Sequence, residues 1–224
     1  MVQCNNLKRV SIIAMKRSHG KKFSVGIDEV GRGPLAGSVA VCALIVFNQN
    51  VLKRFPSNCD SKSISEKKRE QIYLELQKEK QKKTIDYCVA HVSAAHIDRY
   101  GIEVAIQKAV AQALKVVASD GESVEVFLDG RLRAPISYTH QSSHIKGDAQ
   151  FQIIGLASIL AKVDRDRAMT AIHKKYPQYG FAQHKGYGTL KHRKAIMKHG
   201  ITSIHRKSFL KNYMGAKKGK KLAK

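Results

Sequence analysis

The sequence feature that most constrains this chain is the stretch FSVGIDEVGRGPLAG, residues 23–37. Apolar side chains alternate with smaller ones from residue 23 to residue 27, the period-2 pattern of a strand that buries one face. Asp28 and Glu29 follow directly, ahead of a Gly-Arg-Gly-Pro turn. Because successive strand side chains point to opposite faces, both carboxylates can serve one site only where the strand ends or twists. Two interpretations are open: a solvated acid pair at a strand end, or metal-binding acids beside the phosphate-binding fork of Arg32.

The charge balance predicts a polyanionic partner. The 224 residues include 41 Lys and Arg against 17 Asp and Glu, a formal net charge of +24. Nucleic acid is the first candidate and an anionic membrane surface the second. No run approaches the roughly 20 apolar residues that a membrane span needs. The four cysteines form no C-x-x-C pair, which argues against a zinc cluster or a disulfide framework and favours a reducing cytoplasm.

The remaining apolar patterns predict strands and helices in alternation, within one sizeable core. A continuous apolar run at residues 38–47 favours a strand buried on both faces. Helical spacing of apolar residues predicts an amphipathic helix at 102–117. The other expected elements are strands at 84–93, 124–128 and 140–145 and helices at 63–83 and 147–175. Ser63, three residues before Glu66, has the spacing of a capping box.

Two further places offer carboxylates to a site. Asp129 ends an apolar strand directly before a glycine, where an acid often caps a turn but can equally be a third metal ligand beside Asp28. The helix expected at 147–175 carries Asp164 and Asp166. Two residues apart on a helix, these side chains diverge by roughly 200°, so both cannot face one metal pair. Helical periodicity does not choose between them.

Three motifs, in this order, resemble those of type 2 ribonuclease H (ribonuclease HII). The first is the acid pair with Gly-Arg-Gly-Pro-Leu-Ala-Gly, residues 28–37, and the second is ASILAKVDRDR, residues 157–167. The third is HKGYGTLKH, residues 184–192. The segment IHRKSF, residues 204–209, resembles the family's closing Arg-Arg-Ser-Phe, with a lysine in place of one arginine. The resemblance spans roughly residues 23–209.

The resemblance implies four acids that are both catalytic and metal-binding: Asp28, Glu29, Asp129 and Asp166. The family pattern places the last acid after Lys-Val-x-Arg, which selects Asp166 and leaves Asp164 as the fallback. Carboxylates that gather from separate elements repel one another unless cations neutralise them. Hard divalent ions prefer oxygen ligands, so Mg²⁺ or Mn²⁺ is expected, in a two-ion mechanism.

The resemblance also implies how the substrate is bound. The backbone of Gly31, Arg32 and Gly33 is expected to read the 2′-hydroxyl, which distinguishes RNA from DNA, with help from Tyr187. Considered without the resemblance, a tyrosine in a Gly loop is more often a partly buried residue that contributes to packing. Lys62, in a partial match to the family's Asp-Ser-Lys segment, is a candidate phosphate contact, although a single lysine is more often a solvated charge.

The expected fold class is α/β: the ribonuclease H-like fold, a mixed five-stranded sheet flanked by helices, with a small C-terminal helical appendage. A catalytic domain at 23–210 is expected between a flexible basic extension, residues 1–22, and a disordered basic tail, residues 211–224. The implied activity is metal-dependent hydrolysis of RNA in RNA–DNA hybrids, including single ribonucleotides embedded in duplex DNA. Its products would carry 3′-hydroxyl and 5′-phosphate ends, and its role would be ribonucleotide removal in DNA replication and repair. These nucleic acids are the expected partners, and no membrane is expected to bind. The protein is expected to be a cytoplasmic monomer.

Three alternatives stay open. The type 3 relative shares the core but has Gly-Lys-Gly in the turn and an additional N-terminal domain, for which 22 residues leave no room. Another acid-cluster nuclease of the same fold would lack the HKGYGT segment. A basic RNA-binding protein without catalysis would explain the charge but not four acids at motif positions.

Overall fold

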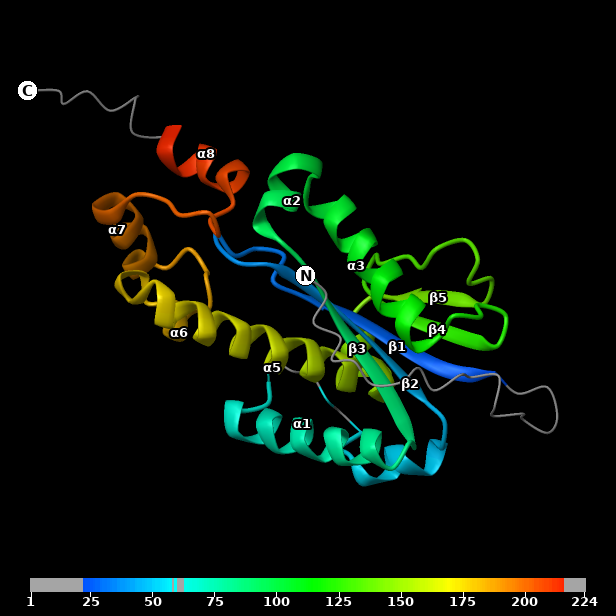
Figure 1. Ribbon diagram of the computed structural model, residues 1–224. Helices are drawn as coiled ribbons and strands as arrows, with labels where there is room; N and C mark the ends of the chain where they lie inside the picture. Colours follow the sequence, from blue (N-terminus) through cyan, green and yellow to red (C-terminus); the bar gives the residue numbers. More distant parts are fainter. Residues whose placement is uncertain (1–21, 58, 60–62, 216–224) are drawn as a thin grey trace, which may run out of the picture.

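The expected mixed five-stranded sheet is confirmed. In the computed structural model, which describes residues 22–57, 59 and 63–215, the strand order is β3-β2-β1-β4-β5 (Figure 1). Strands β1, β4 and β5 are parallel, whereas β2 pairs antiparallel with both β1 and β3. The strands are β1 (Phe23–Val30), β2 (Val39–Val46), β3 (Ile85–Val92), β4 (Val124–Asp129) and β5 (Gln141–His144).

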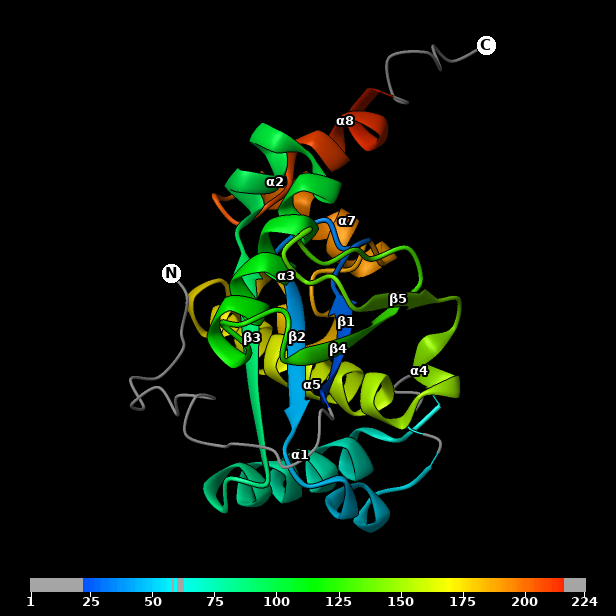
Figure 2. The ribbon, with the colours of Figure 1, turned by 90° about the vertical axis from the view of Figure 1, so that its right-hand side faces the viewer.

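Helices cover both faces of the sheet. Helix α3 (Ile102–Val117) packs on one face, while α5 (Gln152–Lys175) and α1 (Glu66–Gln81) pack on the other. Figure 1 shows α3 on one side of the strands and α5 with α1 on the other, and in Figure 2 the strands lie side by side. The remaining helices are short: η2 (Gln49–Arg54), α2 (Ala94–Tyr100), α4 (Gly147–Gln150), η3 (Pro177–Tyr179), α6 (Phe181–His184), α7 (Leu190–His199) and α8 (Lys207–Gly215).

Strand β2 is buried along its whole length, as its continuous apolar run predicts. Because strand side chains alternate, half of them enter the core under α3 and half the core under α5. The first set is Val39, Val41, Ala43 and Ile45, and the second is Ala40, Cys42, Leu44 and Val46.

The same alternation sets the faces of β1. Val25 and Ile27 lie in the core under α3, so Gly26 and Asp28 face α5. A Cβ on Gly26 would lie 2.4 Å from the carbonyl oxygen of Ile153, so only glycine lets α5 approach the strand this closely. This close approach sets the distance between α5 and the strand that carries the first acid.

Helices α6 to α8 form the expected C-terminal appendage. A separate small core joins Leu35 and Ala36, which follow the Gly-Arg-Gly-Pro turn, to Met169 of α5 and to the appendage. An isolated bridge pairs Ala36 with His205. The appendage therefore lies against the turn that follows the acid pair (Figure 1).

Several local expectations need correction. The side chain that caps α1 is Ser65, which accepts from the Lys68 N–H, and not Ser63. The helix expected at 147–175 is broken at Phe151, whose backbone is extended. Helix α2 was not expected at all. Helix α8 continues to Gly215, so the first residues of the expected tail are helical; Lys62, residues 1–21 and residues 216–224 lie outside the described residues.

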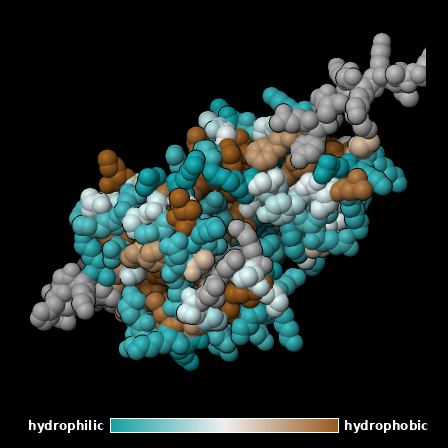
Figure 3. Space-filling model, turned by 180° about the vertical axis from the view of Figure 1, so that it is seen from behind, coloured by the Kyte–Doolittle hydropathy of each residue, from teal (hydrophilic) through white to brown (hydrophobic). Residues whose placement is uncertain are grey.

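No helix within the described part of the chain combines the length and apolar character needed to cross a membrane. Hydrophilic side chains cover most of the face shown in Figure 3, with separate apolar patches between them.

Candidate active site

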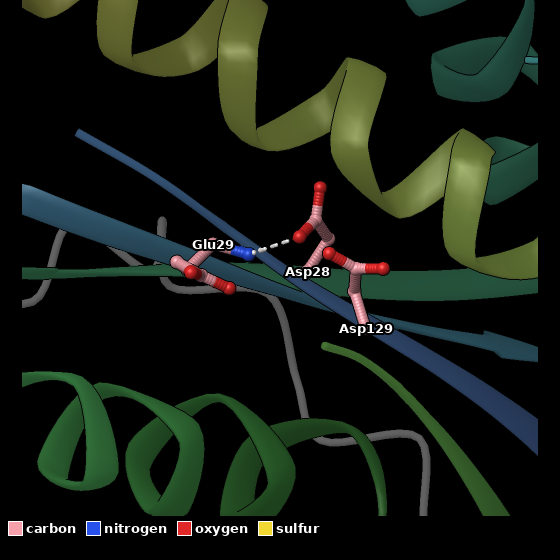
Figure 4. Close-up of side chains that lie close together, drawn as sticks. All are labelled: Asp28, Glu29 and Asp129. Carbon is pink, nitrogen blue, oxygen red and sulfur yellow. Dashed lines mark hydrogen bonds between the residues drawn. The ribbon is translucent and has the colours of Figure 1, made fainter. Parts of the chain in front are cut away.

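Three acids meet at the carboxyl ends of two neighbouring parallel strands. The pairing of Ile27 with Leu128 places the next residues, Asp28 and Asp129, side by side. One oxygen from each of Asp28, Glu29 and Asp129 lies within 4.8 Å of the others (Figure 4). Asp28 and Glu29 are adjacent and yet reach one site because β1 ends immediately afterwards, at Val30. The expected convergence of these three acids is therefore present.

The cluster is electrostatically strained. Asp28 is 6% exposed, and burial, together with the charges of Glu29 and Asp129, raises its pKa to about 8. Hydrogen bonds from the Ser158 side chain and the Glu29 N–H oppose that rise without cancelling it. Burial also raises the pKa of Glu29 to about 7, although Arg32 acts in the opposite direction. Two carboxylates that resist ionisation, with the Asp129 carboxylate beside them, form a donor set suited to a hard divalent cation.

A fourth acid, Asp148, lies next to Asp129. The carboxylate of Asp129 accepts hydrogen bonds from the N–H groups of Gly147, at 2.7 Å, and Asp148, at 3.4 Å. These are the first residues of α4, so the helix N-terminus stabilises the carboxylate charge. Asp148 itself is half-buried and lies four residues beyond the end of β5.

Asp148 was not among the acids predicted from the sequence, although its position carries a signal. Strands β1, β4 and β5 are parallel, and at or just beyond the carboxyl end of each stands an acid: Asp28, Asp129 and Asp148, respectively. Carboxyl ends of parallel strands share one edge of a sheet, the usual place for a ligand site in such folds. The sequence alone did not show that β5 runs parallel beside β4.

Neither acid of the ASILAKVDRDR motif joins the cluster. Asp166 forms an ion pair with Lys162 on the same helix, at 2.8 Å, and Asp164 accepts from His91 of β3 at 2.6 Å. The turn of α5 that faces Asp28 is the one carrying Ser158. Eight residues separate Ser158 from Asp166, about 12 Å along a helix. Helix register thus separates Asp166 from the site in which the resemblance placed it.

The Gly-Arg-Gly turn begins where β1 ends. Arg32 reaches Glu103 at the start of α3, with its Nη2 2.6 Å from one carboxylate oxygen and 2.9 Å from the other. Its Nη1 lies 4.0 Å from Glu29. Arg32 is therefore held at the rim of the acid cluster, with its side chain 44% exposed.

Tyr187 lies exposed beside the turn. It is 42% exposed, and the neighbouring Gly186 accepts a backbone hydrogen bond from Leu35 at 2.9 Å. The carbonyl of Tyr187 accepts from Nδ1–H of the buried His192 at 2.9 Å. The other ring nitrogen of His192 lies 3.3 Å from Nε2 of His205, so His192 is occupied in fixing the loop. Backbone and histidine contacts hold the loop, while the tyrosine ring remains accessible.

Comparisons with known proteins identify a family for this chain. Residues 25–212 match the family model described as Ribonuclease HII. A ribonuclease HII of Ruminiclostridium cellulolyticum is 40% identical over 207 residues, covering 92% of this chain and 77% of that protein. A ribonuclease HII of Marinomonas sp. is 41% identical, covering 82% of this chain and 88% of that protein.

Solved structures show the same fold. The ribonuclease HII complex with PCNA from Archaeoglobus fulgidus matches with a TM-score of 0.67 and 22% identity, covering 82% of this chain and 93% of that chain. Bst-RNase HIII in complex with Mn²⁺ matches with a TM-score of 0.66 and 16% identity, covering 90% of this chain and 71% of that chain. At these identities the likeness concerns the fold alone, whereas the family model and the curated relatives are of type 2. The chain belongs to the ribonuclease HII family, the endonucleases of ribonuclease H type 2.

Proposed function

We propose that this enzyme is a divalent-metal-dependent endonuclease that hydrolyses RNA in RNA–DNA hybrids and at single ribonucleotides embedded in duplex DNA. The observation that carries the proposal is the convergence of Asp28, Glu29 and Asp129 beside a Gly-rich turn and an exposed tyrosine. The products would carry 3′-hydroxyl and 5′-phosphate ends. Ribonucleotide removal during DNA replication and repair is the role that this activity would serve.

The carboxylates of Asp28, Glu29 and Asp129 would hold Mg²⁺ or Mn²⁺, with Asp148 as the fourth acid at the same sheet edge. Such a cation supplies charge stabilisation and activation of water for phosphodiester displacement. The protein orients its ligands through fixed contacts: Ser158 to Asp28, and the amides at the start of α4 to Asp129. The first contact comes from α5 and the second from α4, which immediately precedes α5 in the chain.

Substrate contacts would come from the Gly-Arg-Gly turn and from the loop that carries Tyr187. The backbone of Gly31, Arg32 and Gly33 would contact the ribose, since only a contact to the 2′-hydroxyl distinguishes RNA from DNA at one position. Tyr187 would stack on the sugar or base beside it. Lys62 remains a proposed phosphate contact outside the described residues.

The primary test is cleavage of a DNA duplex with one ribonucleotide, in Mg²⁺, Mn²⁺ or EDTA. We expect metal-dependent cutting on the 5′ side of the ribonucleotide and none in EDTA. Persistent duplex binding without any cutting would instead support the alternative of a basic nucleic-acid-binding protein.

The choice of the fourth acid gives a direct prediction. Asp148→Asn is expected to lower the cleavage rate by about 100-fold, because it removes a charge at the cluster edge. Asp166→Asn and Asp164→Asn should each stay within about threefold of wild type, because these acids pair with Lys162 and His91 instead. Single-turnover cleavage at saturating metal measures this difference. Loss with Asp166→Asn and retention with Asp148→Asn would restore the assignment that the motif resemblance implied.

Removing the tyrosine ring should weaken cutting at a single ribonucleotide. Tyr187→Ala is expected to lower kcat/KM there by about tenfold, since one stacking contact contributes about 1–3 kcal/mol. Tyr187→Phe should remain close to wild type because the ring is kept. Tyr100→Ala is the matched control, since Tyr100 is similarly exposed but lies on α2. Equal effects of Tyr187→Ala and Tyr100→Ala would contradict the stacking role.

A cytoplasmic monomer is the proposed state of the enzyme. Cys42, Cys59 and Cys88 are buried and form no disulfide among the described residues, which suits a reducing compartment. Sedimentation equilibrium tests the oligomeric state.

A further inference from the structure

Two guanidinium groups lie wholly inside the protein, behind the Gly-Arg-Gly turn. Arg165 of α5 and Arg206, just before α8, are both 0% exposed. Within the ranges that the structure describes, neither forms an ion pair with a carboxylate. Burying a charge without an acid partner is costly unless hydrogen bonds satisfy the group. Their hydrogen bonds therefore indicate what these residues do.

All six of these hydrogen bonds go to backbone carbonyls. Arg206 donates from Nη2 to Gly31 at 2.6 Å, from Nη1 to Arg32 at 2.9 Å and from Nε to Gly37 at 3.0 Å. The three acceptors stand at the two ends of residues 31–37. One guanidinium group therefore connects the beginning and the end of this segment.

Arg165 ties the same turn to the tyrosine loop. It donates to the carbonyls of Ser38 at 2.9 Å, Lys185 at 3.0 Å and Ala36 at 3.3 Å. Its side chain also fills the space behind Gly31, where a Cβ would lie 2.2 Å from Nε of Arg165. Gly31 has a φ of 89°, so the position favours glycine for its backbone conformation as well.

The hydrogen bonds from Arg206 also fix the direction of two backbone N–H groups, because the peptide bond is planar. In a trans peptide the carbonyl and the N–H of the following residue point in opposite directions. With the carbonyls of Gly31 and Arg32 directed at Arg206, the N–H groups of Arg32 and Gly33 point away from the interior. No acceptor for either N–H occurs among the residues described, and a Cβ on Gly33 would meet nothing within 4 Å.

We propose that Arg206, supported by Arg165, is a positioning residue that presents the N–H groups of Arg32 and Gly33 as a donor pair to one oxygen of the substrate. The oxygen is either the 2′-hydroxyl of the ribonucleotide or an oxygen of an adjacent phosphate. The inference deepens the proposed function and rests on it. It gives the segment at 204–206 a role in recognition although that segment lies about 170 residues from the turn in sequence.

The test compares Arg206→Lys with wild type. Lysine keeps the charge but cannot reach three carbonyls with a rigid fork. We expect KM for a duplex with one ribonucleotide to rise about tenfold, with kcat within about threefold of wild type. Affinity for an all-DNA duplex should stay unchanged if the contacted oxygen is the 2′-hydroxyl, and should fall equally if it is a phosphate oxygen. Arg167→Lys, which changes an exposed arginine on α5, is the matched control and should leave both constants unchanged. An unchanged KM in Arg206→Lys would overturn the positioning role.

A second measurement needs no variant and no turnover. In EDTA, the backbone amide signals of Arg32 and Gly33 are followed by NMR while a duplex is added to the wild-type enzyme. Shifts with the ribonucleotide duplex alone would assign the 2′-hydroxyl, and shifts with both duplexes a phosphate oxygen. Absence of shifts in both amides with either duplex would refute the donor pair.

The two proposals can fail separately. A wild-type enzyme that cuts neither a hybrid nor a single-ribonucleotide duplex refutes the proposed function. A wild-type enzyme that cuts, together with an Arg206→Lys enzyme of equal KM, refutes the positioning role alone.

Discussion

Replacing Asp28 with Asn is expected to lower the cleavage rate on the order of 10³-fold or more. Asp28 stands at the centre of the acid cluster, flanked by Glu29 on its own strand and by Asp129 on the neighbouring one. Asparagine has the same shape but no charge, so the site loses an anionic oxygen ligand for its cation without losing volume. Electrostatic groups in a buried site carry large parts of a rate enhancement, because little water screens them.

The measurement is single-turnover cleavage of a single-ribonucleotide duplex over a range of Mg²⁺ concentrations. Glu125→Gln is the matched control, because Glu125 lies on the same strand as Asp129 but is exposed. The Asp28→Asn enzyme should still bind the duplex, since the substitution makes the wild-type formal net charge of +24 more positive. Cleavage by Asp28→Asn at a rate near that of wild type would exclude Asp28 from the active site.

The sheet could be predicted from the sequence because its signals are local. Alternation in β1 and the continuous apolar run of β2 follow from burial on one face and on two faces, respectively. Asp28, Glu29 and Asp129 could be placed at the ends of apolar strands for the same reason, whereas their gathering in one site was implied by the family resemblance. The pairing of β1 with β4 then converts a sequence separation of 101 residues, from 28 to 129, into contact.

What could not be predicted depends on register between distant elements. The position of α5 along β1 is set by contact at Gly26, and this contact puts Ser158 rather than Asp166 next to Asp28. The break at Phe151 is tertiary too, because this ring stacks on Phe127 with a centroid distance of 5.5 Å.

Arg165 and Arg206 show a related limit of sequence reasoning. Arginines in a chain this basic are expected at the surface, and nothing in their immediate neighbours predicts burial. Both lie in segments that resemble family motifs, within 157–167 and 204–209, yet their contacts are with backbone carbonyls. A motif can therefore mark residues that support a site as well as residues that act in it.

The same Asp28→Asn substitution is expected to stabilise the metal-free enzyme at alkaline pH, by about 2 kcal/mol. The folded-state pKa of Asp28, about 8, lies above its ordinary value of 3.8. Folded protein therefore binds this proton more tightly than unfolded protein does. The free energy of unfolding should fall as pH rises from about 4 to about 8 and then level off. A pKa difference of about four units would change the free energy of unfolding by about 5 kcal/mol at most. Coupling to Glu29 and local relaxation reduce this value.

Thermal unfolding in EDTA at pH 5 and pH 8.5 isolates this contribution, because the difference between the variant and wild type cancels other titrating groups. The variant's gain in Tm should be larger at pH 8.5, by roughly 4–8 °C for a chain of this size. Added Mg²⁺ should raise the Tm of wild type more than that of the variant, because only the folded wild type holds the complete ligand set. A wild-type protein that is more stable than Asp28→Asn in EDTA at pH 8.5 would show that the cluster is not strained. A gain in stability together with a loss of cleavage would mean that the enzyme maintains mutual repulsion among these acids because catalysis requires their charge.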